Sequence, residues 1–358
     1  AARVPLLDLA FETMRHLLDD FTRSATAALD MEKLLTAYVL LDRLCQQYIQ
    51  KAVNMLHTSN VLVWHHKLLL AWCARLPSLP SNFAIGEADH RTVHGYIWAE
   101  LQLAKQCGPS FADALSGTVA HQELLFPGGS MNAVLPVYEH APSNAFYNDC
   151  VVGAVKAALE LLSTYGHIIV VEVGAGSGGT ASSVLPIFEH MCQRYVFTDV
   201  SEVFLRQARA RFVDFDFVDY TLLNIDADIG FQGFAPHQHD LLISTNCLHA
   251  TPFMCNTLRN CEKLLCAGGL LIANEGLYTA AFPQITFGMT DGWWLFSESR
   301  DRERVGQGCP LLAWRQWQAL LVESKFYQAC CMRGGTFLNG QAVIVARTSL
   351  PPCIQAPT

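Results

Sequence analysis

A glycine-rich stretch, VVEVGAGSGGT at residues 170–180, is the first candidate for chemistry in this 358-residue sequence. An apolar run leads into four closely spaced glycines, among them Gly174 and Gly176, which is typical of a strand that ends in a ligand-binding turn. No Lys follows, as a phosphate-binding P-loop requires, although the GxGxxG spacing of dinucleotide sites is formally present. The loop therefore predicts a nucleotide-like ligand without identifying it.

Three acidic residues near this loop narrow the choice of ligand. Asp199 ends the next apolar run, 25 residues after Gly174, where a carboxylate can accept both hydrogen bonds of a ribose diol. Nicotinamide dinucleotides and S-adenosylmethionine both carry such a diol. Glu172 would repel a pyrophosphate but suits an ammonium and a sulfonium, so it favours S-adenosylmethionine, unless it only caps neighbouring groups. Asp226, after the third apolar run, either meets the adenine amino group or is an ordinary loop acid.

Two further polar residues follow apolar runs that read as neighbouring strands. His249 comes shortly after HDLLIST, and Glu275 follows GGLLIAN. In open α/β sheets ligands lie across the carboxyl ends of the strands, and neighbouring strands are about 4.8 Å apart. Glu275 can then orient the imidazole, favour one tautomer and raise its basicity, which predicts a general base paired with a carboxylate. A histidine without such a partner is more often structural.

Other residues are assigned to the site by their position. Asn246, in the same segment as His249, is expected at the cofactor. Tyr147 and Asn148 stand where the helical region enters the core and are expected to face the substrate cavity, with Tyr147 as a further catalytic residue. Core packing is the alternative for Tyr147.

The tryptophan pair Trp293–Trp294, in GMTDGWWLF, is expected to wall the same substrate cavity, with plain core packing as the alternative. The motif His237-Gln238-His239 has the composition of a metal site, but a surface loop is the favoured interpretation. No metal is therefore assigned.

The elements that must position these residues fall into two parts. Up to about residue 150, apolar residues recur at intervals of three and four, which predicts helices, with residues 108–132 as a looser lid segment. From 151 to 350, short β-branched runs alternate with helical stretches, and two strands close the chain. We expect an α/β fold with a Rossmann-like, mostly parallel sheet covered by helices on both faces, preceded by a helical lid domain over 1–150.

Composition limits the classes of partner. The net charge is −8 and no basic run occurs, which argues against a nucleic acid. No apolar run reaches the roughly 18 residues of a membrane span. The 13 cysteines form no CxxC pair and suit reduced, buried thiols in a cytoplasmic protein. Because the chain begins with Ala, we expect a domain excised from a longer protein.

With these motifs in place, the sequence resembles the methyltransferase domains embedded in modular and fungal polyketide synthases. The segments that carry the resemblance occur in the order and at the spacing of that family, from about residue 120 to 335: GAGSGGT, FTDVS, STNCLHAT, LLIANEG and FGMTDGWWLF. The resemblance implies a class I S-adenosylmethionine-dependent enzyme with His249 and Glu275 as its catalytic dyad. It also implies a substrate carried as a thioester on an acyl carrier protein, with other synthase domains as neighbours.

The expected reaction is therefore transfer of a methyl group from S-adenosylmethionine to the α-carbon of a malonyl or β-ketoacyl thioester. That carbon is acidic, so a neutral His with an ordinary pKa of about 6.5 is a suitable base, and the step needs no metal. Three alternatives stay open at this point. The same dyad can deprotonate a β-hydroxyl for O-methylation, the domain can be a non-catalytic structural remnant, or it can be a nicotinamide-dependent reductase.

Overall fold

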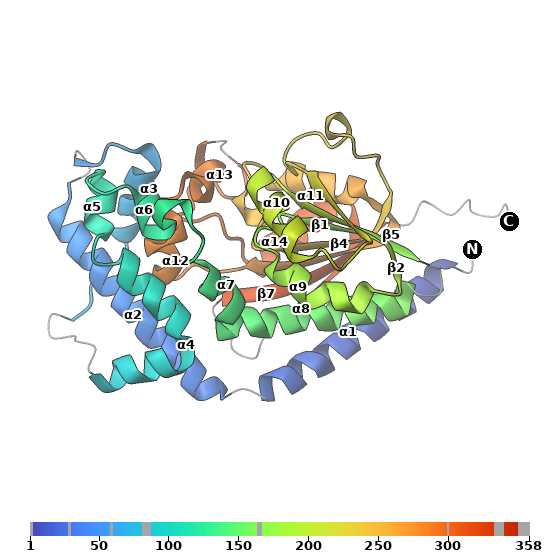
Figure 1. Cartoon of the computed structure of the whole chain (residues 1–358), viewed down its shortest axis with the longest axis horizontal. Coiled ribbons are helices and arrows are strands. Elements are labelled where there is room, and N and C mark those ends of the chain that lie inside the picture. Colours follow the sequence, from blue (N-terminus) through green and yellow to red (C-terminus); the bar gives the residue numbers. More distant parts are fainter. Residues whose placement is uncertain are drawn as a thin grey trace.

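The computed structural model describes residues 3–27, 30–57, 60–80, 87–162, 167–298, 301–332 and 340–349. Two parts lie side by side along the longest axis, with a group of helices at one end and the sheet at the other (Figure 1). The helical part begins with long helices and continues in shorter ones: α1 (Arg3–Ala27), α2 (Met31–Met55), α3 (Trp64–Cys73), α4 (Glu87–Cys107), α5 (Phe111–Ser116), α6 (His121–Leu125), α7 (Leu135–His140) and α8 (Pro142–Leu162). The helical periodicity of the first part is confirmed.

The second part is a seven-stranded sheet in the order β3-β2-β1-β4-β5-β7-β6. The strands from β1 to β5 pair in parallel, whereas β7 runs antiparallel to both β5 and β6. Their bounds are β1 (Ile168–Val173), β2 (Cys192–Asp199), β3 (Val218–Leu222), β4 (His239–Thr245), β5 (Leu265–Gly276), β6 (Phe326–Met332) and β7 (Gln341–Thr348). The predicted fold class is confirmed, including the closing pair of strands.

Helices cover both faces of this sheet, which explains why its central strands are apolar on both sides. Successive strand residues point to opposite faces, so Val170 packs with α8, α9 (Gly179–Phe188) and α10 (Glu202–Arg211). The neighbouring Val171 packs with α11 (Met254–Leu264) and α14 (Trp314–Glu323) on the other face. An acid inside β1, Glu172, interrupts this apolar pattern.

The two parts of the chain are joined by α8, which runs across the boundary expected near residue 150. This helix packs against α1, α7 and α9 as well as β5 and β7. The looser segment 108–132 contains α5, α6 and a short 3-10 turn, η2 (Pro127–Gly129). A division at residue 150 into lid region and core stays a prediction.

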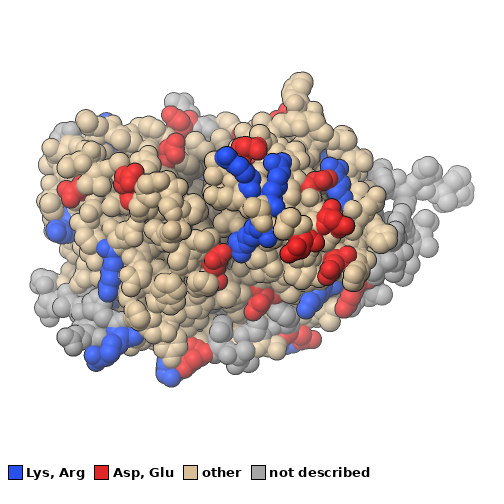
Figure 2. Space-filling model, viewed as in Figure 1, with Lys and Arg blue, Asp and Glu red and all other residues tan. Residues whose placement is uncertain are grey.

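Surface charge and helix composition bear on the classes of partner expected from the sequence. Figure 2 shows acidic and basic side chains intermingled on the half of this face that covers the sheet. None of the described helices combines the length and apolar character that a membrane crossing demands.

The order of the strands places the site. Strand β1 lies between β2 and β4. The connection after β1 leads to β2 on one side and the connection after β4 leads to β5 on the other, so a crevice opens between the carboxyl ends of β1 and β4. The residues that follow β1, β2, β3, β4 and β5 all reach this edge of the sheet.

Candidate active site

The glycine loop after β1 has the backbone of a ligand cradle. Gly174, Gly176 and Gly178 have φ values of +66°, +55° and +80°, in the left-handed region that favours glycine. A Cβ atom at Gly174 would lie 2.1 Å from Sγ of Cys247, so this glycine is also required for close approach. The loop can therefore bring bare backbone against a ligand.

Asp199, at the end of β2, is held beside this loop by backbone donors. Its Oδ2 atom accepts a hydrogen bond of 2.9 Å from the N–H of Gly176, and Oδ1 accepts one of 2.8 Å from Ser201. Burial raises the pKa of its carboxyl, while these backbone bonds oppose the shift. The carboxylate is positioned before any ligand binds.

Glu172 is buried in β1, with 1% of its surface exposed. The Tyr195 hydroxyl donates a 2.7 Å hydrogen bond to its Oε2 atom. Burial raises the pKa of Glu172 to about 8, the Tyr195 bond lowers it, and the charge of Asp199 raises it further. A buried acid of this kind gains most from a cationic ligand.

A cavity of about 720 Å³ collects the residues expected at the cofactor, a volume within the usual range for small-molecule sites. Its lining includes all six of them: Glu172, Gly174, Gly176, Asp199, Asp226 and Asn246. Asp226 is tied to α11, since its Oδ1 atom accepts from the Phe253 N–H at 3.2 Å and from the Thr257 hydroxyl at 3.3 Å. The residues fit a ligand that carries a diol and positive charge.

His249 and Glu275 meet as the strand order predicts, because β4 and β5 are parallel neighbours. Nδ1 of His249 lies 2.5 Å from Oε2 of Glu275, and both side chains are buried. The other carboxylate oxygen, Oε1, accepts the backbone N–H groups of Leu248 at 2.8 Å and Cys247 at 3.1 Å. Since Nδ1 is engaged, Nε2 is the nitrogen of His249 available to a reacting group.

His249 lines a second, smaller cavity of about 260 Å³ together with Trp293. The indole and imidazole rings meet edge to face, with centroids 5.8 Å apart. The two cavities adjoin because they share six lining residues: Tyr138, Asn144, Asn246, Ala250, Phe287 and Thr290. Asn246 and Ala250, on either side of His249 in the sequence, line both cavities, so His249, which lines only the smaller one, lies beside their junction.

Three residues expected at the substrate do not line the smaller cavity. Trp294 belongs to the core, where its Nε1 donates to the Gly288 carbonyl at 2.8 Å, outside the lining of both cavities. Asn148 lines the larger cavity, not the one that holds His249. Tyr147 is buried and donates to the Gln341 carbonyl at 2.7 Å, again outside both linings. A catalytic role for Tyr147 stays a prediction.

The motif at 237–239 is used in backbone hydrogen bonding. Nδ1 of His237 bonds to the Leu265 carbonyl at 2.9 Å, and Nδ1 of His239 bonds to the Leu264 carbonyl at 3.0 Å. Both imidazoles therefore hold the beginning of β4 against the beginning of β5, at the edge of the sheet opposite the cavities.

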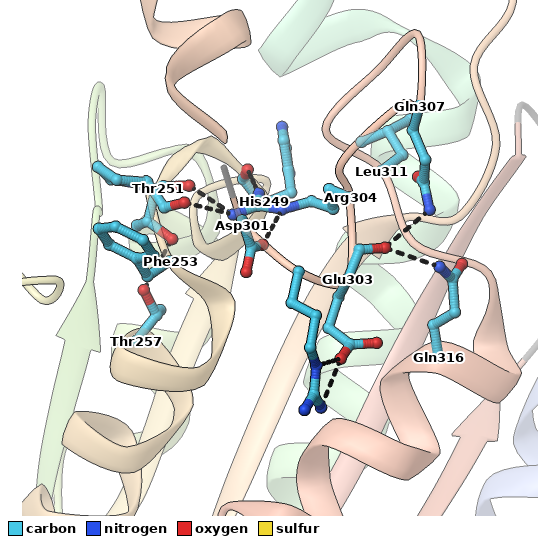
Figure 3. Close-up of polar contacts among 12 residues, drawn as sticks. His249, Thr251, Phe253, Thr257, Asp301, Glu303, Arg304, Gln307, Leu311 and Gln316 are labelled. Atoms are coloured by element: carbon cyan, nitrogen blue, oxygen red, sulfur yellow. Dashed lines mark hydrogen bonds and ion pairs between the residues drawn. The ribbon is translucent and has the colours of Figure 1, made fainter. Parts of the chain in front are cut away.

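A buried arginine, Arg304, holds the backbone of the segment that carries His249 (Figure 3). Its guanidinium donates to the His249 carbonyl at 2.6 Å and to the Thr251 carbonyl at 2.7 Å. Its Nε atom lies 2.5 Å from the buried carboxylate of Asp301. Sequence analysis missed it because ESRDRERVG has the appearance of an exposed charged run, and only the Asp-x-x-Arg spacing signals a pair.

Comparison with known proteins agrees with this geometry. Residues 171–271 match a family model described as a methyltransferase domain. The polyketide synthase ThaG of Burkholderia thailandensis is 38% identical over 239 residues, which cover 66% of this chain and 4% of ThaG. PksM, a polyketide synthase of Bacillus subtilis, is 31% identical over 242 residues, covering 64% of this chain and 6% of PksM. The chain thus spans only a small part of these relatives.

Solved structures extend the comparison to nearly the whole chain. The carbon methyltransferase of CurJ is 25% identical with a TM-score of 0.81, covering 96% of this chain and 99% of that one. The CMeT domain of the citrinin polyketide synthase shares the fold at 23% identity and a TM-score of 0.76, covering 97% and 98%.

The fold and the matching family together define a class I methyltransferase domain, whose methyl donor is S-adenosylmethionine. More narrowly, the chain is similar to the methyltransferase domains of polyketide synthases. The alternative of a nicotinamide-dependent reductase is not supported by any of these matches.

The raised pKa of Glu172 predicts a pH-dependent effect of Glu172→Gln. Between its ordinary pKa of 4.5 and about 8, the unfolded chain ionises this acid while the folded state keeps the proton, so wild-type stability falls as pH rises. We expect Glu172→Gln, which keeps an acceptor for Tyr195, to gain stability relative to wild type from pH 5 to 8, by up to about 1.4 kcal/mol per pH unit. Urea denaturation measures this difference.

A second pair of urea measurements checks that prediction. Glu189→Gln, at an exposed position, is the matched control and is expected to show no pH-dependent difference. If the free energy of unfolding of Glu172→Gln differed from that of wild type by the same amount at every pH from 5 to 8, Glu172 would not be a buried, protonated acid.

Arg304→Met is expected to lower the free energy of unfolding by about 3–5 kcal/mol, because it leaves the buried Asp301 carboxylate unpaired. Arg302→Met is the control two residues away, since the Arg302 side chain is 78% exposed, and its stability is expected to stay close to wild type. Chemical denaturation compares the two variants. Equal, small effects would show that Arg304 does not hold the segment.

Proposed function

We propose that this domain methylates the α-carbon of an acyl thioester carried on an acyl carrier protein, with His249 as the general base. The observation that carries the proposal is the buried His249–Glu275 pair beside the junction of the two cavities. The description of the CurJ domain as a carbon methyltransferase supports the site of methylation. The polyketide synthases among the relatives support a carrier protein as the part that delivers the substrate.

The larger cavity is the place for the methyl donor. Asp199 would hold the ribose diol, Glu172 would face the positively charged part, and the turn from Gly174 to Gly176 would let the ligand approach the backbone. When bound, S-adenosylmethionine supplies an electrophilic methyl group. CalH, which shares this fold at a TM-score of 0.68 and 23% identity, is described in complex with SAH.

The proton is handled by His249 and Glu275. Nε2 of His249 takes the proton from the α-carbon, the C–H bond breaks, and its electron pair is delocalised over the thioester carbonyl. Glu275 accepts the Nδ1–H bond and stabilises the imidazolium that forms. The backbone N–H groups of Leu248 and Cys247 keep the carboxylate in place during this change of charge.

The smaller cavity is the place for the acyl group. Trp293, Phe282 and Leu311 supply apolar walls that exclude water from the enolate. Its volume of about 260 Å³ suits the short end of an acyl chain, with the thioester arm extending outward. Asn144, which lines both cavities, is a polar contact at the junction.

Replacement of His249 tests the base. We expect His249→Gln to bind S-adenosylhomocysteine with an unchanged Kd by calorimetry, while methylation of a β-ketoacyl carrier protein falls by about 10²- to 10⁴-fold. Mass spectrometry of the carrier protein measures the added methyl group. His239→Asn, a buried imidazole whose Nδ1 bond an amide can replace, is the control with wild-type turnover. Undiminished turnover by His249→Gln would contradict the role of His249 as the general base.

The position of the methyl group tests the reaction itself. We expect ¹³C NMR of product made with labelled methyl donor to place the label on the α-carbon of a β-ketoacyl substrate. A β-hydroxyacyl carrier protein is the companion substrate, because the same dyad can deprotonate a hydroxyl. Label found only on oxygen would replace C-methylation by O-methylation, and no transfer to either substrate would contradict both.

A further inference from the structure

Three histidines that are far apart in the sequence meet in the helical part, away from both cavities. His65 and His66 lie in the first turn of α3, and His121 is the first residue of α6. One nitrogen from each ring lies within 4.8 Å of the others, and the ring centroids are 4.5 to 5.9 Å apart. His65 and His66 are 5% and 1% exposed, and His121 is half-buried.

The hydrogen bonding of this cluster is incomplete. Nε2 of His65 and Nε2 of His66 both lie 3.0 Å from the carbonyl oxygen of Met289. Their Nδ1 atoms are buried and have no hydrogen-bond partner of normal geometry, although the Leu115 backbone also acts on His66 and raises its pKa. If each Nε2–H donates to Met289, each Nδ1 keeps a lone pair without a donor, which is unfavourable for a buried group. A metal ion is one partner that such lone pairs accept.

Protonation favours the same conclusion. Burial lowers the pKa of His65 to about 4, and it also lowers the pKa values of His66 and His121. Neighbouring imidazoles lower the pKa values of His65 and His121 further, whereas Asp291 raises both slightly. All three rings are therefore neutral near pH 7, which is the form that binds a metal.

We propose that His65, His66 and His121 form a binding site for a divalent transition-metal ion of the zinc class. Three imidazoles suit Zn²⁺, with metal–nitrogen distances of about 2.0–2.1 Å, and a ligating His commonly donates its other N–H to a backbone carbonyl. Met289 provides that carbonyl for two of the rings. The sequence gives no signal of this cluster, because residues 65 and 121 lie far apart in it.

The position of the site indicates a structural role. Met289 belongs to the 3-10 turn η6 (Phe287–Met289), and Phe287 and Thr290 beside it line both cavities. An ion held by α3 and α6 would therefore stabilise the turn η6, which forms part of the wall of the acyl cavity, from the side away from that cavity. His249 lies outside the cluster, so the ion takes no part in the proton transfer proposed above.

The test uses the untagged chain after removal of metal with a chelator. We expect one equivalent of Zn²⁺ to bind by calorimetry and to raise the Tm. His65→Gln and His66→Gln keep an amide that can donate to Met289, so they are expected to match the stability of metal-free wild type. Each should weaken Zn²⁺ binding at least tenfold and abolish the rise in Tm. His121→Gln should do the same.

Controls separate this site from the 13 cysteines and from histidines elsewhere. His239→Asn is expected to bind Zn²⁺ as wild type does. Substitution with Co²⁺ is expected to give visible bands without the near-ultraviolet absorption of thiolate ligands. Absence of binding, thiolate absorption, or unchanged binding by the His→Gln variants would each overturn the proposal, and none of these readouts depends on methyl transfer.

Discussion

The buried carboxylate of Glu275 is the constraint on which the rest of the site depends. A carboxylate with no exposed surface is costly unless each oxygen is matched by donors. Here His249 satisfies one oxygen, and the N–H groups of Cys247 and Leu248 satisfy the other. The turn after β4 must therefore fold tightly over the end of β5, and the imidazole is placed beside the junction of the cavities as a result.

The same turn couples the base to the glycine loop. Cys247 donates its N–H to Glu275, and its side chain occupies the space that a Cβ atom at Gly174 would need. The cradle after β1 and the dyad after β4 and β5 are thus packed against one another through one residue. Because a shift of either loop would disturb the other, the two loops hold the two cavities in fixed positions relative to one another. Arg304 holds the far end of this turn by its carbonyls.

Sequence predicts the parts of this site that follow from local pattern. Strand periodicity places Glu172, Asp199 and Glu275 at one edge of a parallel sheet, and the glycine spacing predicts the turn between them. The burial of neighbouring aromatic residues outside the strands has no such signal. Trp293 reaches His249 while Trp294 fills the core, and nothing in their shared segment distinguishes them. Arg304 and the cluster of His65, His66 and His121 depend on segments brought together only by folding.

The buried polar groups at the site share a thermodynamic property. In the protein without ligand, each of them either lowers the free energy of unfolding or raises it only slightly. Glu172 keeps a proton at neutral pH only because ionisation in its buried position is unfavourable. The pair of Asp301 and Arg304 gains attraction but loses the solvation of two charges, so an apolar pair of similar size would stabilise the fold equally well.

These groups instead determine which ligand the site favours and where its backbone lies. A buried acid without a matching cation favours a cationic ligand, and a guanidinium bound to successive carbonyls fixes a turn that apolar contact alone would leave free to shift. Glu172, in the strand that leads into the glycine loop, and Arg304, which binds the carbonyl of His249, are therefore parts of one arrangement that loses stability but fixes the positions of the site residues.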